Sequence, residues 1–204
     1  TVYIAVLEWS NPETLGSMSI GDRLLTAFFH AVQVRTSGFN SVDIGELTSE
    51  TWLGMDVLMF IGGGPAGTAG GIKVTTFAVL LFIILTELRG EAAVNIFGKR
   101  LSRAVHREAI TIALLSLAAV MSATAALMLI TDLELDVLLF EVVSAFGTVG
   151  LSTGITADLP DAAKVVLMVL MFFGRLGPLT LGTALVLRRR RILYELPKER
   201  PVIG

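Results

Sequence analysis

Long runs of apolar residues dominate the chain and predict membrane helices. A helix rises about 1.5 Å per residue, so roughly 20 apolar residues are needed to cross a hydrocarbon core of about 30 Å. Ile110–Ile130 meets this length without a charge, and Val165–Leu187 meets it with one charge, Arg175. Trp52–Leu85 is too long for one straight crossing, and Gly62–Gly71 interrupts it with six glycines and one proline. These residues do not sustain a continuous helix, so a broken membrane helix is predicted there.

Two shorter apolar stretches predict helices that enter the membrane and turn back. Leu24–Val34 and Val137–Phe146 contain only eleven and ten residues, too few to span a bilayer. A glycine-containing turn follows each of them, at Arg35–Asn40 and at Gly147–Ser152. Irregular backbone at membrane depth is tolerated only where protein buries it or where it lines a water-filled path.

Composition supports a membrane protein and excludes several kinds of site. The 204 residues are 53% hydrophobic and 17% charged, with a mean hydropathy of +0.76. Soluble domains average about 45–50% apolar and about 25% charged residues. Without cysteine, the chain has no disulfide framework, thiolate zinc site or cysteine nucleophile. Its two histidines, His30 and His106, are far apart, and no nucleophile or metal set typical of an enzyme is visible.

The basic residues predict which side of the membrane each loop faces. Eleven of the sixteen lie in two segments, 89–107 and 188–200, whereas acidic residues predominate in the opposite loops. Because cytoplasmic loops are enriched in Lys and Arg, the C-terminus is expected in the cytosol, and the acidic outer side is expected to attract cations.

The two halves of the chain repeat each other with a shift of 112 residues. Thr36 falls on Thr148 and Gly38 on Gly150, and the segment from Thr36 to Gly70 shows ten identities in 35 positions. Each unit reads as membrane helix, short re-entrant helix, Thr-x-Gly turn and membrane helix, with most of the opening helix of the first unit lacking. A unit that crosses an even number of times keeps its orientation, so the fold is expected to be an all-α integral membrane protein. Its tandem parallel helix–pore loop–helix repeats would surround a potassium-channel-like pore, unlike the inverted repeats of many carriers.

The two turns carry the chemistry of a cation filter. A dehydrated monovalent cation needs oxygen ligands, and potassium filters supply backbone carbonyls. Glycine lets the backbone turn these carbonyls inward, and the re-entrant helix directs its negative C-terminal end at the ion. An ordinary helix cap and turn is the alternative for one copy, but two copies at matching positions favour the filter. The candidate filter residues are Thr36, Ser37, Gly38, Phe39, Thr148, Val149, Gly150 and Leu151.

The glycine-rich break predicts a mobile constriction below the filter. Gly62-x-Gly64-x-x-Gly67 formally matches a dinucleotide fingerprint, but a membrane helix precedes it where that motif needs a strand. A static glycine packing interface is the alternative. Lys73 and Arg175 are charges near mid-membrane and are expected to face the path or a partner, with Asp56 or Glu141 as alternative ion-pair partners of Arg175. The candidate gate residues are Gly62, Gly63, Gly64, Gly67, Thr68, Gly70, Gly71, Lys73 and Arg175.

Several motifs resemble the Trk/Ktr/HKT superfamily of potassium transporters, in particular its bacterial Ktr-type membrane subunit. They cover nearly the whole chain and are Leu7-Glu8-Trp9 with Asn11-Pro12, Arg35–Asn40, Gly62–Phe77, Phe146–Ser152, Gly174–Pro178 and Glu199–Gly204. Members of this family have four such repeats around one pore. The resemblance implies that this chain corresponds to the third repeat (residues 1–90), a basic cytoplasmic linker (91–107), the fourth repeat (108–190) and a cytoplasmic tail (191–204).

The resemblance also implies roles and partners. Gly38 and Gly150 would be filter glycines, the segment 62–71 an intramembrane gating loop, and Arg175 a neighbour of that loop. Potassium would be the substrate and sodium an activator, with no covalent cofactor and no nucleic acid bound. A homodimer in a bacterial inner membrane, docked on a cytosolic nucleotide-binding regulatory ring, is expected. A secondary carrier of sodium with a mid-membrane site is the alternative, which the common orientation of the repeats disfavours.

Overall fold

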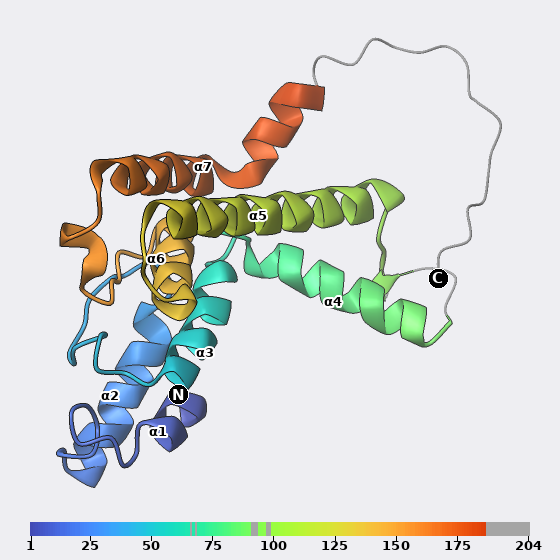
Figure 1. Ribbon diagram of the computed structural model, residues 1–204. Helices are drawn as coiled ribbons and strands as arrows, with labels where there is room; N and C mark the ends of the chain where they lie inside the picture. The colour runs from blue at the N-terminus through green and yellow to red at the C-terminus, as the bar shows by residue number, and fades with distance from the viewer. Residues whose placement is uncertain (66, 68, 91–93, 97–98, 187–204) are drawn as a thin grey trace, which may run out of the picture.

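The computed structural model describes residues 1–65, 67, 69–90, 94–96 and 99–186, and these residues are mainly helical (Figure 1). The predicted gate residue Thr68, the end of the predicted span at Leu187 and the tail 191–204 lie outside the described residues. In chain order the elements are α1 (Val2–Leu7), α2 (Ile20–Gln33), α3 (Ser49–Phe60), α4 (Val74–Leu88), β1 (Asn95–Ile96), β2 (Lys99–Arg100), α5 (Arg103–Ile130), α6 (Leu135–Gly147), a 3-10 helix (Ile155–Ala157) and α7 (Asp161–Val186).

Polar caps explain why the helices begin earlier than the apolar runs. The Ser19 hydroxyl accepts a hydrogen bond from the Asp22 amide at 3.3 Å and donates one to the Asp22 carboxylate at 2.7 Å. Such a reciprocal cap satisfies a free amide of the first turn, so α2 starts at Ile20 rather than at Leu24. Ser102 caps α5 in the same way through the Val105 amide.

The predicted repeat is visible in the backbone. Asp161 begins α7 and Ser49 begins α3, and these numbers differ by 161 − 49 = 112. Among the described residues, Thr36 (φ 70°) and Thr148 (φ 51°) are the non-glycine residues with positive φ, and they differ by the same 112 positions. Two threonines in this sparsely populated conformation at equivalent places indicate that both turns have one construction.

Helix α6 forms the centre of the described structure. It contacts α3, α5 and α7, and residues 141–147 are all buried. Trp52 of α3 packs against Phe140 with ring centroids 6.2 Å apart, and Phe60 packs against Phe146 at 5.8 Å. An apolar helix enclosed on several sides is a core element, so the turn that follows it is carried on a fixed base.

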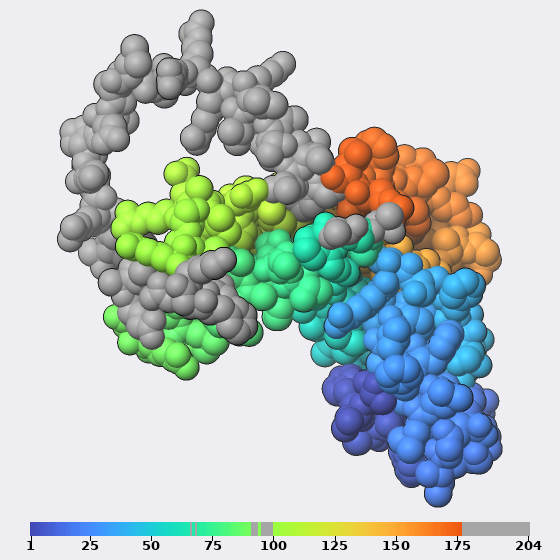
Figure 2. Space-filling view, turned by 180° about the vertical axis from the view of Figure 1, so that it is seen from behind, coloured from blue at the N-terminus to red at the C-terminus, as the bar shows by residue number. Residues whose placement is uncertain are grey.

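Helix α5 lies between α4 and α7 and has the properties of a membrane helix (Figure 1). Among the described helices it is the one whose length and apolarity suffice to cross a bilayer, and α4 is a shorter apolar helix. Leu114, Leu117, Met121 and Leu129 of α5 are exposed. In the space-filling view α1 and α2 form a lobe at one end of the molecule (Figure 2). Leu25 and Phe28 of α2 are exposed. These large apolar faces need lipid or further protein to cover them.

The glycine-rich break separates α3 from α4. Helix α3 ends at Phe60 and α4 begins at Val74, and backbone bonds join the two ends of the break. The Gly62 amide donates to the Ile72 carbonyl at 2.8 Å, and the Ile72 amide donates to the Phe60 carbonyl at 3.1 Å. Residues 62–71 are called the glycine loop below. The end of α3 and the residues just before α4 therefore lie side by side at the two ends of this loop.

Candidate functional site

Two backbone turns from the two repeats meet at the centre of the candidate site. The first turn is Thr36–Phe39 after α2, and the second turn is Thr148–Leu151 after α6. A β-carbon added to Gly38 would lie 2.5 Å from the Val149 carbonyl oxygen, and one added to Gly150 would lie 3.8 Å from the Gly38 α-carbon. The structure therefore brings the two predicted turns into direct contact, although 112 residues separate them in sequence.

The conformation of each turn depends on its glycine. Gly38 has a φ of 69° and Gly150 a φ of 91°, values that favour glycine strongly. Ser37, Phe39 and Gly150 are exposed, whereas Val149 and Leu151 are buried. Both turns follow the C-terminal ends of helices, where carbonyl groups lack partners within the helix and carry partial negative charge. The two turns thus lie at helix ends whose partial negative charge is of the sign that attracts a cation.

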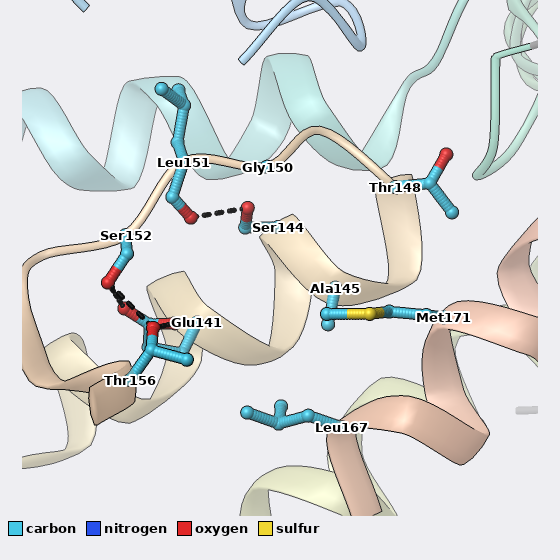
Figure 3. Close-up of a pocket in the computed structure, with 10 residues that line it drawn as sticks. All are labelled: Glu141, Ser144, Ala145, Thr148, Gly150, Leu151, Ser152, Thr156, Leu167 and Met171. Carbon is cyan, nitrogen blue, oxygen red and sulfur yellow. Dashed lines mark hydrogen bonds between the residues drawn. The ribbon is translucent and has the colours of Figure 1, made fainter. Parts of the chain in front are cut away.

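A hydrogen-bond network behind the second turn was missed by the sequence reasoning (Figure 3). The Ser144 hydroxyl donates to the Leu151 carbonyl at 2.6 Å, so this carbonyl is turned toward α6. Glu141 accepts hydrogen bonds from the Ser152 hydroxyl, the Thr153 amide and the Thr156 hydroxyl. The signal in the sequence is Glu141, the one carboxylate within the apolar run Val137–Phe146, followed by a segment rich in serine and threonine.

Behind the first turn the support is sparser. His30 of α2 is buried, and its Nε2 lies 3.1 Å from the Ser41 hydroxyl. Its Nδ1 lies 3.2 Å from the Gln33 side-chain amide, which fixes the ring from the other side. His30 is thus a buried, hydrogen-bonded residue of α2. The Trp52 indole of α3 donates to the Ile44 carbonyl at 2.8 Å and holds the following loop.

The glycine loop packs directly on the base of the second turn. A β-carbon on Gly70 would lie 2.7 Å from the Thr148 hydroxyl and 2.8 Å from the Gly147 carbonyl oxygen. Gly71 has a φ of 73°, and a β-carbon there would approach the Phe60 carbonyl at 3.1 Å. The structure therefore brings this part of the predicted gate to the predicted filter, while the position of Gly64 is open to its surroundings.

The two predicted intramembrane charges lie at different helices, α4 and α7. Lys73 directly precedes α4, and its ammonium group donates hydrogen bonds to the Ala69 carbonyl at 2.5 Å and to the Gly67 carbonyl at 3.3 Å. Arg175 lies on α7 with an exposed side chain, one residue beyond Gly174, which packs on the Phe146 carbonyl of α6. Lys73 is thus tied to the glycine loop, and Arg175 extends from a helix that touches the base of the second turn.

A second buried carboxylate anchors the loops next to the site. Glu8 is fully buried, and its oxygens accept from the Thr48 amide at 2.9 Å, the Thr51 hydroxyl at 2.6 Å, the Thr14 hydroxyl at 2.7 Å and the Asn11 amide at 2.7 Å. Burial alone would raise the pKa of Glu8, but the hydrogen bonds from these groups outweigh it and lower the pKa. Glu8 is therefore a charged hub that joins α1 to the start of α3.

Comparison with known proteins places the chain in a family. Residues 1–191 match the family model described as TrkH, cation transport protein. The Ktr system potassium uptake protein B of Vibrio alginolyticus is 40% identical over 204 residues, which are 100% of this chain and 45% of that protein. The protein of the same name from Bacillus subtilis is 42% identical over 177 residues, 87% of this chain and 40% of the relative.

A further relative and a solved structure extend the comparison. The potassium/sodium uptake protein NtpJ of Enterococcus hirae is 32% identical over 200 residues, 95% of this chain and 44% of the relative. The crystal structure of the potassium transporter TrkH from Vibrio parahaemolyticus matches with a TM-score of 0.70 at 23% identity, covering 92% of this chain and 41% of that one. The expected helical membrane fold is confirmed, and the chain spans less than half the length of these relatives.

Proposed function

This chain belongs to the TrkH family of cation transport proteins, and from this membership we propose that the protein takes up potassium ions across a cell membrane. The ions would pass through a channel-like pore to which this chain contributes two of the selectivity-filter segments. The observation that carries the proposal is the contact between the two Thr-x-Gly turns, where Gly38 of one repeat faces the Val149 carbonyl of the other. Relatives named as potassium uptake proteins support the choice of ion.

Carbonyl oxygens of the two turns would replace the water shell of the ion. Potassium filters work in this way, because a ring of backbone carbonyls offsets the cost of dehydration. In the first turn the candidates are Thr36, Ser37, Gly38 and Phe39. In the second turn Thr148, Val149 and Gly150 would supply oxygens, while Leu151 would act as the anchor point, since its carbonyl already accepts from Ser144.

The glycine loop would close the path below the filter. Its approach to Gly147 and Thr148 supports a barrier next to the filter base, and the two bonds from Lys73 would hold that barrier shut. Arg175 would add a positive charge that repels a passing cation. Opening would then require the loop to leave the second turn while its ends stay joined at Gly62 and Ile72.

We also propose an assembly, which the relatives' names and the charge pattern support in part. Both Ktr relatives are named as protein B of a system, which supports a multi-component transporter, and we assign the partner as a cytosolic nucleotide-binding regulatory ring. The chain would form the third and fourth repeats of a homodimeric subunit in a bacterial inner membrane, with its C-terminus in the cytosol. Potassium is the substrate in this proposal, and sodium acts as an activator.

A sodium carrier is the second candidate, because one relative is named as a potassium/sodium uptake protein. The test expresses the protein from its complete gene in cells that lack their own potassium uptake systems. We expect growth at low potassium to be restored and rubidium to be taken up with saturation. Protein present in the membrane without rescue would refute potassium uptake, and sodium uptake without rubidium uptake would favour the carrier.

A further inference from the structure

The second turn is held from behind by two buried polar side chains of α6. Glu141 is 4% exposed and Ser144 is 3% exposed, and both face the chain that leaves the turn (Figure 3). We propose that Glu141 and Ser144 are positioning residues that set the ion affinity and selectivity of the second turn. This inference rests on the proposed function, because it assigns a task to groups that do not themselves touch the ion.

Ser144 fixes the end of the turn. Its hydroxyl donates to the Leu151 carbonyl at 2.6 Å, a short bond that sets the peptide plane one residue beyond Gly150. Gly150 has no side chain to restrict its own rotation, and its φ of 91° is one of several values that glycine adopts easily. A fixed point directly after Gly150 therefore limits the directions that the turn's carbonyls can take.

Glu141 fixes the segment that follows, Ser152–Thr156, called the exit segment below. One carboxylate oxygen accepts from the Ser152 hydroxyl at 2.5 Å and from the Thr153 amide at 3.0 Å, and the other accepts from the Thr156 hydroxyl at 2.9 Å. The Glu141 side chain thus binds three residues of the exit segment. Because this segment directly follows the second turn, fixing it also restricts the turn.

These hydrogen bonds add to the packing that buries Val149 and Leu151 of the second turn. A cavity of about 310 Å³ lies between α6, the exit segment and α7, with Leu167 and Met171 of α7 on its far side (Figure 3). Next to this cavity, the hydrogen bonds to Glu141 and Ser144 tie the exit segment and Leu151 to α6. They fix the direction of the Leu151 carbonyl, which burial of the Leu151 side chain does not set by itself.

At the first turn, the helix positions equivalent to Glu141 and Ser144 carry no polar side chains. The residues 112 positions before Glu141 and Ser144 are Phe29 and Val32, which are apolar and 38% and 52% exposed. Helix α2 reaches the segment after its turn through the His30–Ser41 pair, with 3.1 Å between nitrogen and oxygen. The two repeats thus differ in how firmly their turns are held, and the second turn is the better place for the ion geometry to be defined.

The experiment compares variants of the protein expressed from its complete gene, by rubidium uptake and by its inhibition with sodium. Glu141→Ala is expected to raise the half-saturation concentration at least tenfold and to lower the preference over sodium by a similar factor. Glu141→Gln should stay within threefold, because its amide oxygen still accepts from Thr153 and its amide nitrogen can donate to Thr156. Ser144→Ala should raise the half-saturation concentration threefold to tenfold.

Thr124→Ala is the matched control. Thr124 is also a buried hydroxyl residue, but it lies on α5 and bonds only to the Val120 carbonyl of its own helix. We expect this variant to keep the wild-type half-saturation concentration and selectivity.

Unchanged half-saturation in Ser144→Ala, or a loss of maximal rate in Glu141→Ala with unchanged half-saturation and selectivity, would overturn the positioning role. A Glu141→Gln protein as impaired as Glu141→Ala would overturn it as well, because the charge rather than the hydrogen bonds would then matter. A silent wild-type protein would instead refute the proposed function, so the two failures are distinguishable.

Discussion

The two filter glycines should differ in their tolerance of alanine, because their surroundings differ. Alanine at Gly150 would meet the Gly38 α-carbon at 3.8 Å, an ordinary contact, so its cost comes from the positive φ of 91°. Alanine at Gly38 carries a similar cost from its φ of 69°, and its methyl group would also lie 2.5 Å from the Val149 carbonyl oxygen. Either that oxygen or the first turn must then move, and both belong to the proposed ion site.

The magnitudes follow from these two terms. A non-glycine residue in the left-handed region costs about 1–2 kcal/mol, and about 1.4 kcal/mol is a factor of ten in affinity. We therefore expect Gly150→Ala to raise the half-saturation concentration for rubidium about tenfold. Displacement of a ligand carbonyl should at least double this free-energy cost. Gly38→Ala should therefore raise the half-saturation concentration for rubidium about a hundredfold, which corresponds to about 3 kcal/mol.

The assay is rubidium uptake over a range of concentrations, normalised to the amount of protein in the membrane. Gly38→Ala and Gly150→Ala should both reach the membrane, because the strain is local to the turns. Equal effects of the two substitutions would refute the contact between Gly38 and Val149 as a determinant of affinity. Wild-type half-saturation in both variants would remove the turns from the ion path altogether.

The remaining predictions concern the glycine loop, the buried hub and the C-terminal tail. Deleting part of 62–71 should raise the maximal flux if the loop obstructs the path, and a folded variant with unaltered or lower flux would favour static packing instead. Gly70→Ala should raise flux as well, because its methyl group would lie 2.7 Å from the Thr148 hydroxyl, whereas Gly64→Ala, with open space around it, is the matched control. Glu8→Gln should lower the free energy of unfolding by about 1–3 kcal/mol at neutral pH, since one acceptor becomes a donor facing other donors. Because the pKa of Glu8 is lowered in the folded protein, the ionised side chain stabilises the fold at neutral pH, and this stabilisation is lost as the pH falls below about 4. The melting temperatures of wild type and Glu8→Gln in detergent should therefore differ at pH 7 and converge in acid. Removal of 201–204, which lies outside the described residues, should weaken the dimer without affecting membrane insertion, and an undiminished dimer in crosslinking would exclude this role.

Periodic and local features of the sequence predicted the helices and the two turns well. The apolar runs Leu24–Val34 and Val137–Phe146 correspond to α2 and α6, although both helices begin earlier because polar residues of the first turn do not register as apolar. The repeat placed the positive-φ glycines at Gly38 and Gly150. It did not predict that the threonines two residues before them share this conformation, since β-branched residues disfavour it.

Contacts between distant segments were beyond the reach of the sequence. Glu141 is one of the two expected alternative partners of Arg175, and the structure adds that its carboxylate oxygens accept from Ser152, Thr153 and Thr156. Which groups reach a carboxylate depends on the path of the chain after the turn, and no periodicity encodes that path. The approach of Gly70 to Thr148 has the same origin, because 78 residues (148 − 70) separate the two positions.

One helix end explains why glycines occur at several distant places in this chain. Backbone from three directions converges on the C-terminal end of α6: Met59 of α3 lies against Gly147, the glycine loop reaches Gly147 and Thr148, and Gly174 of α7 packs on the Phe146 carbonyl. Side chains at these positions would hold the segments apart, so the glycines are needed for close approach rather than for flexibility alone. In the proposed function, the negative end of this helix would also favour a cation in the second turn. Movement of the glycine loop therefore changes the packing of the proposed ion site itself, and a loop variant should alter both maximal flux and half-saturation, whereas a loop that acts only as a plug would alter flux alone.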